Sequence, residues 1–385
     1  MGLGHVTRDV VIADEIRRVR PDLEIDWIAT SPAREYLEER EEHVLPVSEQ
    51  WGDPTGQAES LAGEAQELNL VKWALGLRKG WGHTGRLAFE LLQSGRYDVA
   101  IGDEAYDLAM VLVDRPSPPA CPCFLLFDFL GLDAMTWSPI ERVGAMKFNR
   151  VWSSEPRGRY HPVFLGELQD IPPRSFAPFR PDRRTWAERH ALVVGHVLSF
   201  DPTEYRDRAS VRARLGYGPA PLVLASIGGT AVGADLLDLC VEAFPHARDR
   251  IPDLRMTIVC GPRLTLPGRD LPEGIEVNGY VPRLHEHFAA CDLAITQGGG
   301  TSLLELTVLE RPFLYFPLAG HCEQTIHVAW RQERLKAGVK VVQSKTSAAQ
   351  LGSLIATEIG REVHYPPLPV EGARRLAEAV AEQVR

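Results

Sequence analysis

The 385-residue sequence lacks the features that mark several classes of protein. It has no apolar run that approaches the length of a membrane span, and its amino terminus lacks a charged and then apolar signal pattern. Its formal net charge of −10 argues against a general nucleic-acid binder, because contacts with phosphates require a basic surface. We therefore expect a cytoplasmic globular protein, with peripheral attachment to the inner face of the membrane left open.

The sequence is also poor in metal-binding patterns. Its six cysteines are scattered, most of them in apolar segments, which predicts buried and reduced thiols. Cys121 and Cys123 stand too close together for the usual zinc-binding pair, and no pair of histidines lies near them. These absences make a structural zinc site improbable.

What is present is the ordinary composition of a soluble globular protein. With 44% hydrophobic and 24% charged residues, the chain is long enough for two domains that each bury a core. In the first half, Ile12, Ile16 and Val19 share a helical face, and Ser31-Pro32 is typical of a helix start. Residues 49–94 form a long and mostly helical stretch. The expected strands of this half are Glu24–Ile28, Val99–Gly102 and Cys123–Phe127.

The second half alternates strands and helices more regularly. A segment rich in Pro, Arg and Asp precedes it, so we expect a hinge near His196–Tyr205 and domains over residues 1–198 and 199–385. A charged amphipathic helix over Val370–Val384 ends the chain and is expected to pack back on the first domain. The expected strands are 222–227, 256–260, 275–278, 293–296 and 312–316, and the expected helices are 235–247, 284–290, 301–310 and 324–337. This alternation predicts two doubly wound domains with ligands at the carboxyl ends of the strands.

The amino terminus departs from this pattern. Met1-Gly-Leu-Gly-His5 is a glycine turn that opens a helix, and such a turn normally follows a strand, yet no strand precedes it. Either the first strand was lost through a misassigned start, or the sheet lacks a central element. We favour the first explanation.

Two motifs in the first half could carry chemistry. His5 would lie at the carboxyl edge of the sheet, where an imidazole suits proton transfer, although it could instead only cap the helix. Asp103, with Glu104 beside it, directly follows the strand at 99–102 and could orient the imidazole of His5. The alternative is that this acidic pair caps the following helix.

The second half carries glycine turns of the kind that bind phosphate. In Leu293–Glu305 a strand runs through Gly298-Gly299-Gly300 into a helix, whose free N–H groups and dipole favour an anion. Ser226–Thr230 is a second such turn, and Glu323-Gln324 follows the next strand with groups that suit sugar hydroxyls. Two alternatives remain open: a turn without ligand, and a capping box in which Glu305 satisfies its own helix together with Ser302.

The order of these motifs resembles the GT-B glycosyltransferases. The order is a glycine-His turn, a hinge, a second glycine turn, then Gly-Gly-Gly-Thr-Ser-x-x-Glu and Pro-x₅-Glu-Gln. The resemblance is greatest to the branch that includes the peptidoglycan UDP-N-acetylglucosamine transferase, with the UDP-glycosyltransferases further away. It covers most of the chain and is specific from about Val277 to Val342.

The resemblance implies a role for each motif residue. The backbone near Val281 would meet the nucleobase, Glu305 would bind the ribose, and Glu323 and Gln324 would hold the donor sugar. His5 would be the base that deprotonates the acceptor, assisted by Asp103. Gln297 stands where the plant members have a phosphate-binding His. The remaining donor-binding residues would be Gly228, Gly229, Thr230, Gly298, Gly299, Gly300, Thr301 and Ser302.

The resemblance therefore implies an inverting transferase that moves a sugar from a nucleotide-diphosphate sugar, with UDP as the favoured nucleotide, to an acceptor hydroxyl. The acceptor, whether lipid, glycan or small natural product, is not indicated. The chain has no DxD motif of the kind that metal-dependent transferases use, so we expect no essential metal, and no cofactor because the nucleotide sugar is a substrate. Two alternatives are a UDP-sugar hydrolase in which the same His activates water, and a non-catalytic nucleotide-sugar-binding protein.

Overall fold

The computed structural model describes residues 3–52, 60, 69–156, 158–229, 232–264 and 271–384, with the side chains of 77–79 left out. Thr230, one of the expected donor-binding residues, lies outside these ranges. The described residues form two compact units, one made of residues up to 199 and from 368 onward, the other of residues 200–367 and residue 60. The sequence-based division at 198/199 falls beside the boundary at 199/200, and the end of the chain, expected to pack back on the first domain, lies in the first unit.

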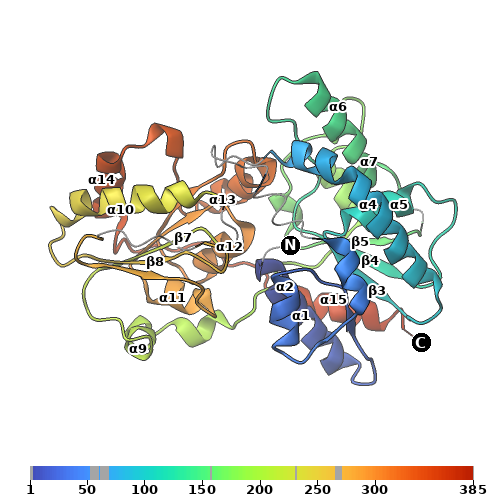
Figure 1. Cartoon of the computed structure of the whole chain (residues 1–385), viewed down its shortest axis with the longest axis horizontal. Helices are drawn as coiled ribbons and strands as arrows, with labels where there is room; N and C mark the ends of the chain where they lie inside the picture. The colour runs from blue at the N-terminus through green and yellow to red at the C-terminus, as the bar shows by residue number, and fades with distance from the viewer. Residues whose placement is uncertain are drawn as a thin grey trace. The chain divides into compact units, whose positions relative to one another are not determined.

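The first unit is an α/β unit with parallel strands (Figure 1). The order of its main sheet is β3-β4-β5-β6, and β1 pairs only with β2. All five residues of β4 are buried, as expected for a parallel strand covered on both faces. The strands are β1 (Asp26–Trp27), β2 (His43–Val44), β3 (Ala100–Asp103), β4 (Cys123–Phe127), β5 (His161–Phe164) and β6 (Leu192–Val193).

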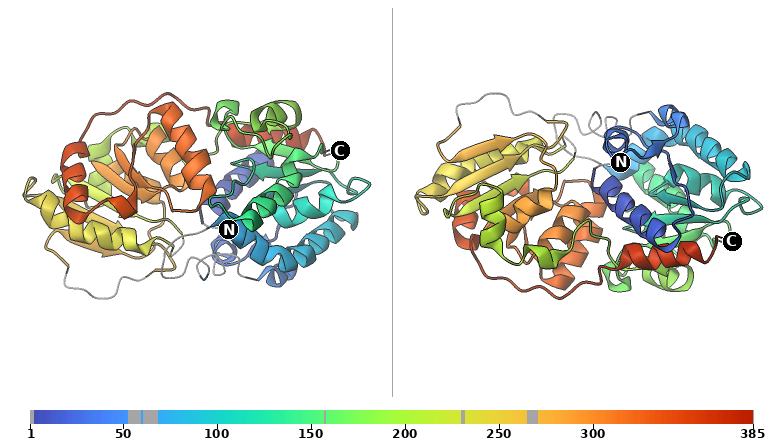
Figure 2. Two further views of the ribbon diagram at one scale, coloured as in Figure 1. Left: turned by 90° about the horizontal axis from the view of Figure 1, so that it is seen from above. Right: turned by 90° about the horizontal axis from the view of Figure 1, so that it is seen from below.

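Two helices from opposite ends of the chain pack together in this unit. α1 (Leu3–Val19) lies beside α15 (Gly372–Ala381), as Figure 2 shows from below. Ile12 and Ile16 of α1 share a core with Leu376 and Val380 of α15. The last helix of the chain therefore belongs to the core of the first unit.

The other helices of the first unit follow the expected pattern with local shifts. α2 begins at Ala33 with Pro32 as its N-cap, so the expected cap at Ser31 is wrong by one position. The described residues begin with α1, so the missing first strand stays a prediction. The helices are α2 (Ala33–Glu38), α4 (Leu70–Gln93), α5 (Tyr106–Val113), α6 (Pro139–Phe148), α7 (Arg150–Ser153) and α8 (Arg183–His190), with 3-10 turns at Pro46–Trp51 and Leu168–Asp170.

The second unit has a six-stranded parallel sheet in the order β12-β11-β10-β7-β8-β9. Its core packs Phe244 of α10 and Leu351 of α14 against Val223, Ile258 and Ile295 of the sheet. The strands are β7 (Leu222–Ser226), β8 (Arg255–Val259), β9 (Ile275–Asn278), β10 (Leu293–Gln297), β11 (Phe313–Phe316) and β12 (Val339–Lys340). The helices are α9 (Arg208–Arg214), α10 (Ala234–Arg248), α11 (Leu284–Ala290), α12 (Gly300–Val308), α13 (Ala329–Leu335) and α14 (Ala348–Glu358), with 3-10 turns at Pro202–Tyr205 and Gln343–Lys345.

Two parts of the second unit differ from expectation. The single helix expected over 324–337 is a π-helical segment, Glu323–Val328, followed by α13, which ends where Lys336 takes a left-handed conformation. α14 was not expected, although its start carries a capping box formed by Ser347 and Gln350.

All six cysteines are free and buried, as the scattered pattern predicted. Burial raises the pKa of the Cys240 thiol to about 12. None of the described helices has the length and apolar character needed to cross a bilayer.

Candidate active site

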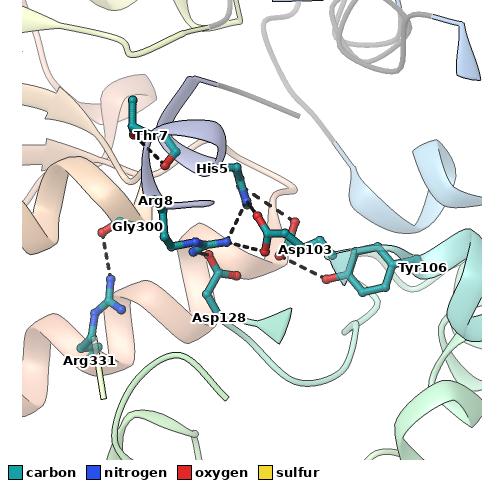
Figure 3. Close-up of polar contacts among 10 residues, drawn as sticks. His5, Thr7, Arg8, Asp103, Tyr106, Asp128, Gly300 and Arg331 are labelled. Carbon is teal, nitrogen blue, oxygen red and sulfur yellow. Dashed lines mark hydrogen bonds and ion pairs between the residues drawn. The ribbon is translucent and has the colours of Figure 1, made fainter. Parts of the chain in front are cut away.

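α1 and β3 bring together the two residues that the sequence pairs at the first glycine turn. The Nδ1 atom of His5 lies 2.7 Å from Oδ2 of Asp103 (Figure 3). Asp103 is the last residue of β3, and its side chain is only 4% exposed, whereas that of His5 is 25% exposed. The alternative of an acidic cap on α5 is wrong, because the N-cap is Ala105 and no side chain bonds there.

The electrostatic setting keeps Asp103 ionised. Burial alone would raise the pKa of its carboxyl, but the charges of Arg8 and His5 outweigh burial and hold this pKa below its usual value. An ionised Asp103 accepts a hydrogen bond from Nδ1–H, a tautomer that we infer from the network. Nε2 of His5 is then the ring atom with a free electron pair, so the pair can take up a proton there.

Sequence reasoning missed two residues that complete this cluster. Nη2 of Arg8 lies 2.6 Å from Oδ1 of Asp103, and its Nη1 lies 3.1 Å from Oδ2 of Asp128. Arg8 comes one helical turn after His5, and Asp128 directly follows β4. Both positions gave a signal: a helical spacing of three residues in one case, and the carboxyl end of a parallel strand in the other.

In the second unit, the three glycines form the turn between β10 and α12. A Cβ on Gly298 would lie 3.0 Å from Cβ of Gln324 and 3.1 Å from Cα of Pro317, whereas one on Gly299 would meet nothing within 4 Å. Gly299 is the N-cap of α12, and no side chain caps this helix. The first N–H groups of α12 therefore lack a side-chain acceptor, as an anion site requires.

Glu305 is not part of a capping box, because Ser302 lies inside α12 rather than at its N-cap. Its side chain is half-buried. Burial raises the pKa of its carboxyl to about 8. A partly desolvated carboxyl of this kind can bind the hydroxyls of a ligand.

Gln297 is engaged within the protein. Its Nε2 donates to the carbonyl oxygen of Val232 at 2.6 Å, and the side chain is buried. Gly233 has a φ of +87°, and a Cβ there would lie 1.5 Å from that Nε2 atom. Gln297 thus uses one of its two amide hydrogens to hold the loop that follows β7.

The remaining expected residues gather around the same turn. Oε1 of Gln324 accepts from the N–H of Leu318 at 2.9 Å, which fixes this side chain beside Gly298. Oε1 of Glu323 would lie 4.0 Å from a Cβ on Gly300. Thr301 and Ser302 occupy the first turn of α12, Gly228 (φ +88°) and Gly229 follow β7, and Val281 is half-buried after β9.

A buried arginine that the sequence did not indicate also reaches this turn. Nη2 of Arg331 on α13 donates to the carbonyl oxygen of Gly300 at 3.1 Å (Figure 3). Because β7, β10 and β11 are adjacent and parallel, the turns at Gly228, Gly298 and Leu318 lie at one edge of the sheet. This edge carries the N–H groups at the start of α12, which are of the kind that bind an anion.

One cluster of the first unit has the composition of a metal site. Ligand atoms of Glu167, Asp170 and His196 lie within 4.8 Å of one another. Glu167 and Asp170 also form a reciprocal capping box, and Oδ2 of Asp170 lies 3.3 Å from Nε2 of His196. Hydrogen bonds and an ion pair account for this arrangement.

The sequence of the second unit matches a known family. Residues 223–359 match the glycosyltransferase family 28 C-terminal domain. An uncharacterized glycosyltransferase of Methanopyrus kandleri is 30% identical over 196 residues, which is 50% of this chain and 55% of that protein. A UDP-N-acetylglucosamine–N-acetylmuramyl-(pentapeptide) pyrophosphoryl-undecaprenol N-acetylglucosamine transferase of an Anaeromyxobacter species is 27% identical, over 56% of this chain and 53% of that protein. The chain thus matches about half the length of these relatives.

Solved structures share the whole fold. The superposition with a spinosyn rhamnosyltransferase complexed with thymidine diphosphate covers 99% of this chain and 93% of that chain. The TM-score is 0.58 and the sequence identity is 17%. The superposition with the UDP-GlcNAc 2-epimerase of Methanocaldococcus jannaschii covers 97% of this chain and 96% of that chain. The TM-score is 0.57 and the sequence identity is 13%. At such identities the likeness concerns the fold alone. The expected GT-B fold and the resemblance to GT-B glycosyltransferases are confirmed.

Proposed function

We propose that this chain, which has the GT-B fold and a glycosyltransferase family 28 C-terminal domain, transfers a sugar from a nucleotide-diphosphate sugar to an acceptor hydroxyl with inversion at the anomeric carbon. UDP is the nucleotide that we propose. The observation that carries the proposal is the 2.7 Å contact between Nδ1 of His5 and Oδ2 of Asp103. It leaves Nε2 of a partly exposed imidazole ready to act as a base.

The proposed reaction is a single displacement. Nε2 of His5 takes the proton of the acceptor hydroxyl while its oxygen forms a bond to the anomeric carbon. The bond between that carbon and the diphosphate oxygen breaks, and its electron pair leaves with the nucleoside diphosphate. Asp103 stabilises the imidazolium that forms, and the N–H groups at the start of α12 stabilise the leaving diphosphate.

Donor recognition is assigned to the second unit. Glu305 would accept hydrogen bonds from the ribose, and Glu323 and Gln324 would contact the sugar. Charge on the leaving group would be neutralised by the helix dipole and the turn at Gly298–Gly300, and we propose no metal for this step. The turn's open space at Gly299 supports this assignment.

A thermal-shift panel tests the donor proposal first. UDP, dTDP, GDP and their hexose conjugates are compared, and a ligand at 100 times its dissociation constant adds about 2.7 kcal/mol of stability. We expect UDP and a UDP-sugar to stabilise the protein most. Rapid release of UDP and free sugar without an acceptor would show a hydrolase, and tight binding without any turnover would show a binding protein.

An exposed apolar surface on the first unit supports a membrane-linked acceptor. Trp137 is 87% exposed and Ile140 76%, and Val143 and Met146 continue the same face of α6. The exposed charged residues of residues 136–150 are all basic, namely Arg142, Lys147 and Arg150, although the chain as a whole is acidic. Such a face suits the headgroup region of an anionic bilayer. We propose that α6 holds the protein at a membrane surface.

Vesicle sedimentation tests this attachment. We expect binding to vesicles of phosphatidylglycerol and phosphatidylcholine, and about fivefold weaker binding for Lys147→Gln, given about 1 kcal/mol for each basic residue near an anionic surface. Ile140→Ser should also weaken binding, whereas Val342→Ser, which changes an exposed residue of the second unit, should not. The proposal would be contradicted if all variants bound the vesicles equally. It would also be contradicted if the wild type were a dimer in solution and Ile140→Ser made it monomeric.

A further inference from the structure

The guanidinium of Arg8 lies between two carboxylates in the first unit. It is 3.1 Å from Asp128 and 2.6 Å from Asp103, and the residue is only 9% exposed. Burial alone would lower the pKa of Arg8, but Asp103, Asp128 and Asp9 outweigh burial and raise it well above the usual value. Arg8 is therefore a permanent positive charge next to the base.

Arg8 also competes with Asp103 for the same atom of His5. Its Nη2 lies 2.9 Å from Nδ1, while Oδ2 of Asp103 lies 2.7 Å from it. A hydrogen on Nδ1 faces an attractive carboxylate and a repulsive guanidinium. The base can hold a proton on Nε2 only where the attraction outweighs the repulsion.

We propose that Arg8 and Asp128 are positioning residues for the His5–Asp103 pair: Arg8 fixes the Asp103 carboxylate beside Nδ1, and Asp128 offsets the positive charge that Arg8 brings. The role of His5 as the base rests on the proposed function. The contacts among the four side chains do not depend on it.

The charges of these four side chains balance when His5 is protonated. Protonated His5 and Arg8 carry two positive charges, and Asp103 and Asp128 carry two negative ones. The pKa of Asp128 is also low, since Arg8 and His5 outweigh the effect of its burial, so this carboxylate stays ionised. A buried charge without a partner is costly, which gives Asp128 its function in the cluster.

Two further acidic groups face the cluster. Oε2 of Glu104 lies 3.9 Å from Nε2 of His5. Asp9, next to Arg8 on α1, has a pKa raised well above the usual value by burial and by Asp103. We assign the charge balance to Asp128, which contacts Arg8 directly, whereas Glu104 lies on the Nε2 side of the imidazole.

Opposite shifts in two variants test the proposal. The titration of the His5 imidazole is followed by NMR of ¹³C-labelled histidine in the full chain, with the signal assigned from His5→Gln. Asp128→Asn removes a negative charge and should move the midpoint about one pH unit lower, whereas Arg8→Met removes a positive charge and should move it about one unit higher. The acid limb of the rate profile should move in the same directions.

Matched controls separate charge from structure. Asp14→Asn and Arg18→Met make the same charge changes at exposed positions of α1 and should leave the midpoint in place. Arg8→Lys keeps the charge, so it should keep the midpoint near that of the wild type but lower the turnover, because an ammonium cannot hold two carboxylates in a fixed fork. If Arg8→Met fails to fold, the titration midpoint of Asp128→Asn and the turnover of Arg8→Lys still test the proposal.

An unchanged midpoint in Asp128→Asn, or shifts in the same direction for Asp128→Asn and Arg8→Met, overturns the proposal. The titration needs no substrate. Opposite shifts in a protein that transfers no sugar would therefore reject the proposed function and leave the positioning roles intact.

Discussion

The amide of Gln297 donates a 2.6 Å hydrogen bond to the carbonyl oxygen of Val232, and the glycine next to Val232 leaves the room for it. This bond ties the loop after β7 to the end of β10, the strand that leads into the turn at Gly298. The two turns are thereby held in one arrangement before any ligand binds. Rigid support of this kind favours a preorganised anion site.

Gly233→Ala should break that support. A Cβ would lie 1.5 Å from Nε2 of Gln297 at a φ of +87°, so both the hydrogen bond and the backbone are disturbed. We expect a loss of about 2–4 kcal/mol in the free energy of unfolding and weaker binding of UDP. Urea unfolding and calorimetry measure the two effects. Gly228→Ala has the same φ but open space, so it should lose only about 1–2 kcal/mol; equal losses would rule out the clash.

Glu305 should make the binding of UDP depend on pH. Burial raises the pKa of its carboxyl to about 8, so the group is mostly protonated at pH 6 and ionises as the pH rises through 8. An ionised carboxylate accepts the ribose hydroxyls better, so UDP should bind more tightly at pH 9 than at pH 6. Glu305→Gln should bind about tenfold or more weakly at pH 9 and lose this dependence; an unchanged affinity would remove Glu305 from the ribose site.

The same carboxyl should affect the stability of the free protein. Because its pKa in the folded state lies above the usual value near 4.5, the folded state binds the proton more tightly than the unfolded state does. Its contribution is fully present below pH 4.5 and is lost as the pH rises to 8. Glu305→Gln should therefore be more stable than the wild type at pH 9, by thermal unfolding, and similar to it at pH 4.5. A loss of stability at pH 9 would contradict this account.

Arg331 should stabilise the turn at Gly298–Gly300 through its hydrogen bond to the carbonyl oxygen of Gly300. Arg331→Met removes the bond to the Gly300 carbonyl and should cost about 1–3 kcal/mol, with a higher KM for the donor. Arg361→Met, at an exposed ion pair of the second unit, should cost less than 1 kcal/mol and leave KM unchanged. Chemical denaturation and donor titrations measure both. A normal KM in Arg331→Met would show that the bond does not shape the site.

α15 should depend on the close approach of Gly372. A Cβ there would lie 2.6 Å from the carbonyl oxygen of His196 and 2.8 Å from that of Gly195, so Gly372→Ala should lose about 1–3 kcal/mol. Gly76→Ala, in open space on α4, should be neutral or slightly stabilising. Thermal unfolding of the two variants compares them directly; an equally stable Gly372→Ala would show that the backbone can move away.

The sequence predicted the regular parts of both units well. Strands such as Cys123–Phe127 and Ile275–Asn278 are continuous apolar or alternating runs, and their bounds agree with the structure. β12 and α14 were not expected: β12 has only two residues, and α14 buries only Leu351, Gly352 and Ile355, too few for a clear helical period. The last helix was expected to pack back on the first domain, and α15 does share a core with α1. Its partners Ile12 and Ile16 lie near the other end of the chain, so the local pattern could not identify them.

The site was predicted in part. The positions of His5 and Asp103 at the ends of their elements predicted that the two side chains meet, and in the structure they are in contact. Arg8 and Asp128 were missed although a helical spacing and the end of a strand place them near His5 and Asp103, because neither position by itself separates a site residue from an ordinary charged one. Arg331 was missed because a single charged residue in a helix gives no pattern of its own. Gln297 stands where the plant members have a phosphate-binding His, and its place among the donor-binding residues stays a prediction. Its amide bonds to a loop that the sequence does not place beside it.

The most direct test of the central claim is the turnover of His5→Ala with the donor and acceptor that the wild type uses. The account predicts a fall of about 10²–10⁴ in kcat with nearly unchanged binding of the donor, because the base touches only the acceptor. Asp103→Asn should fall in the same direction. A His5→Ala variant that keeps near-normal turnover on its acceptor would contradict the account.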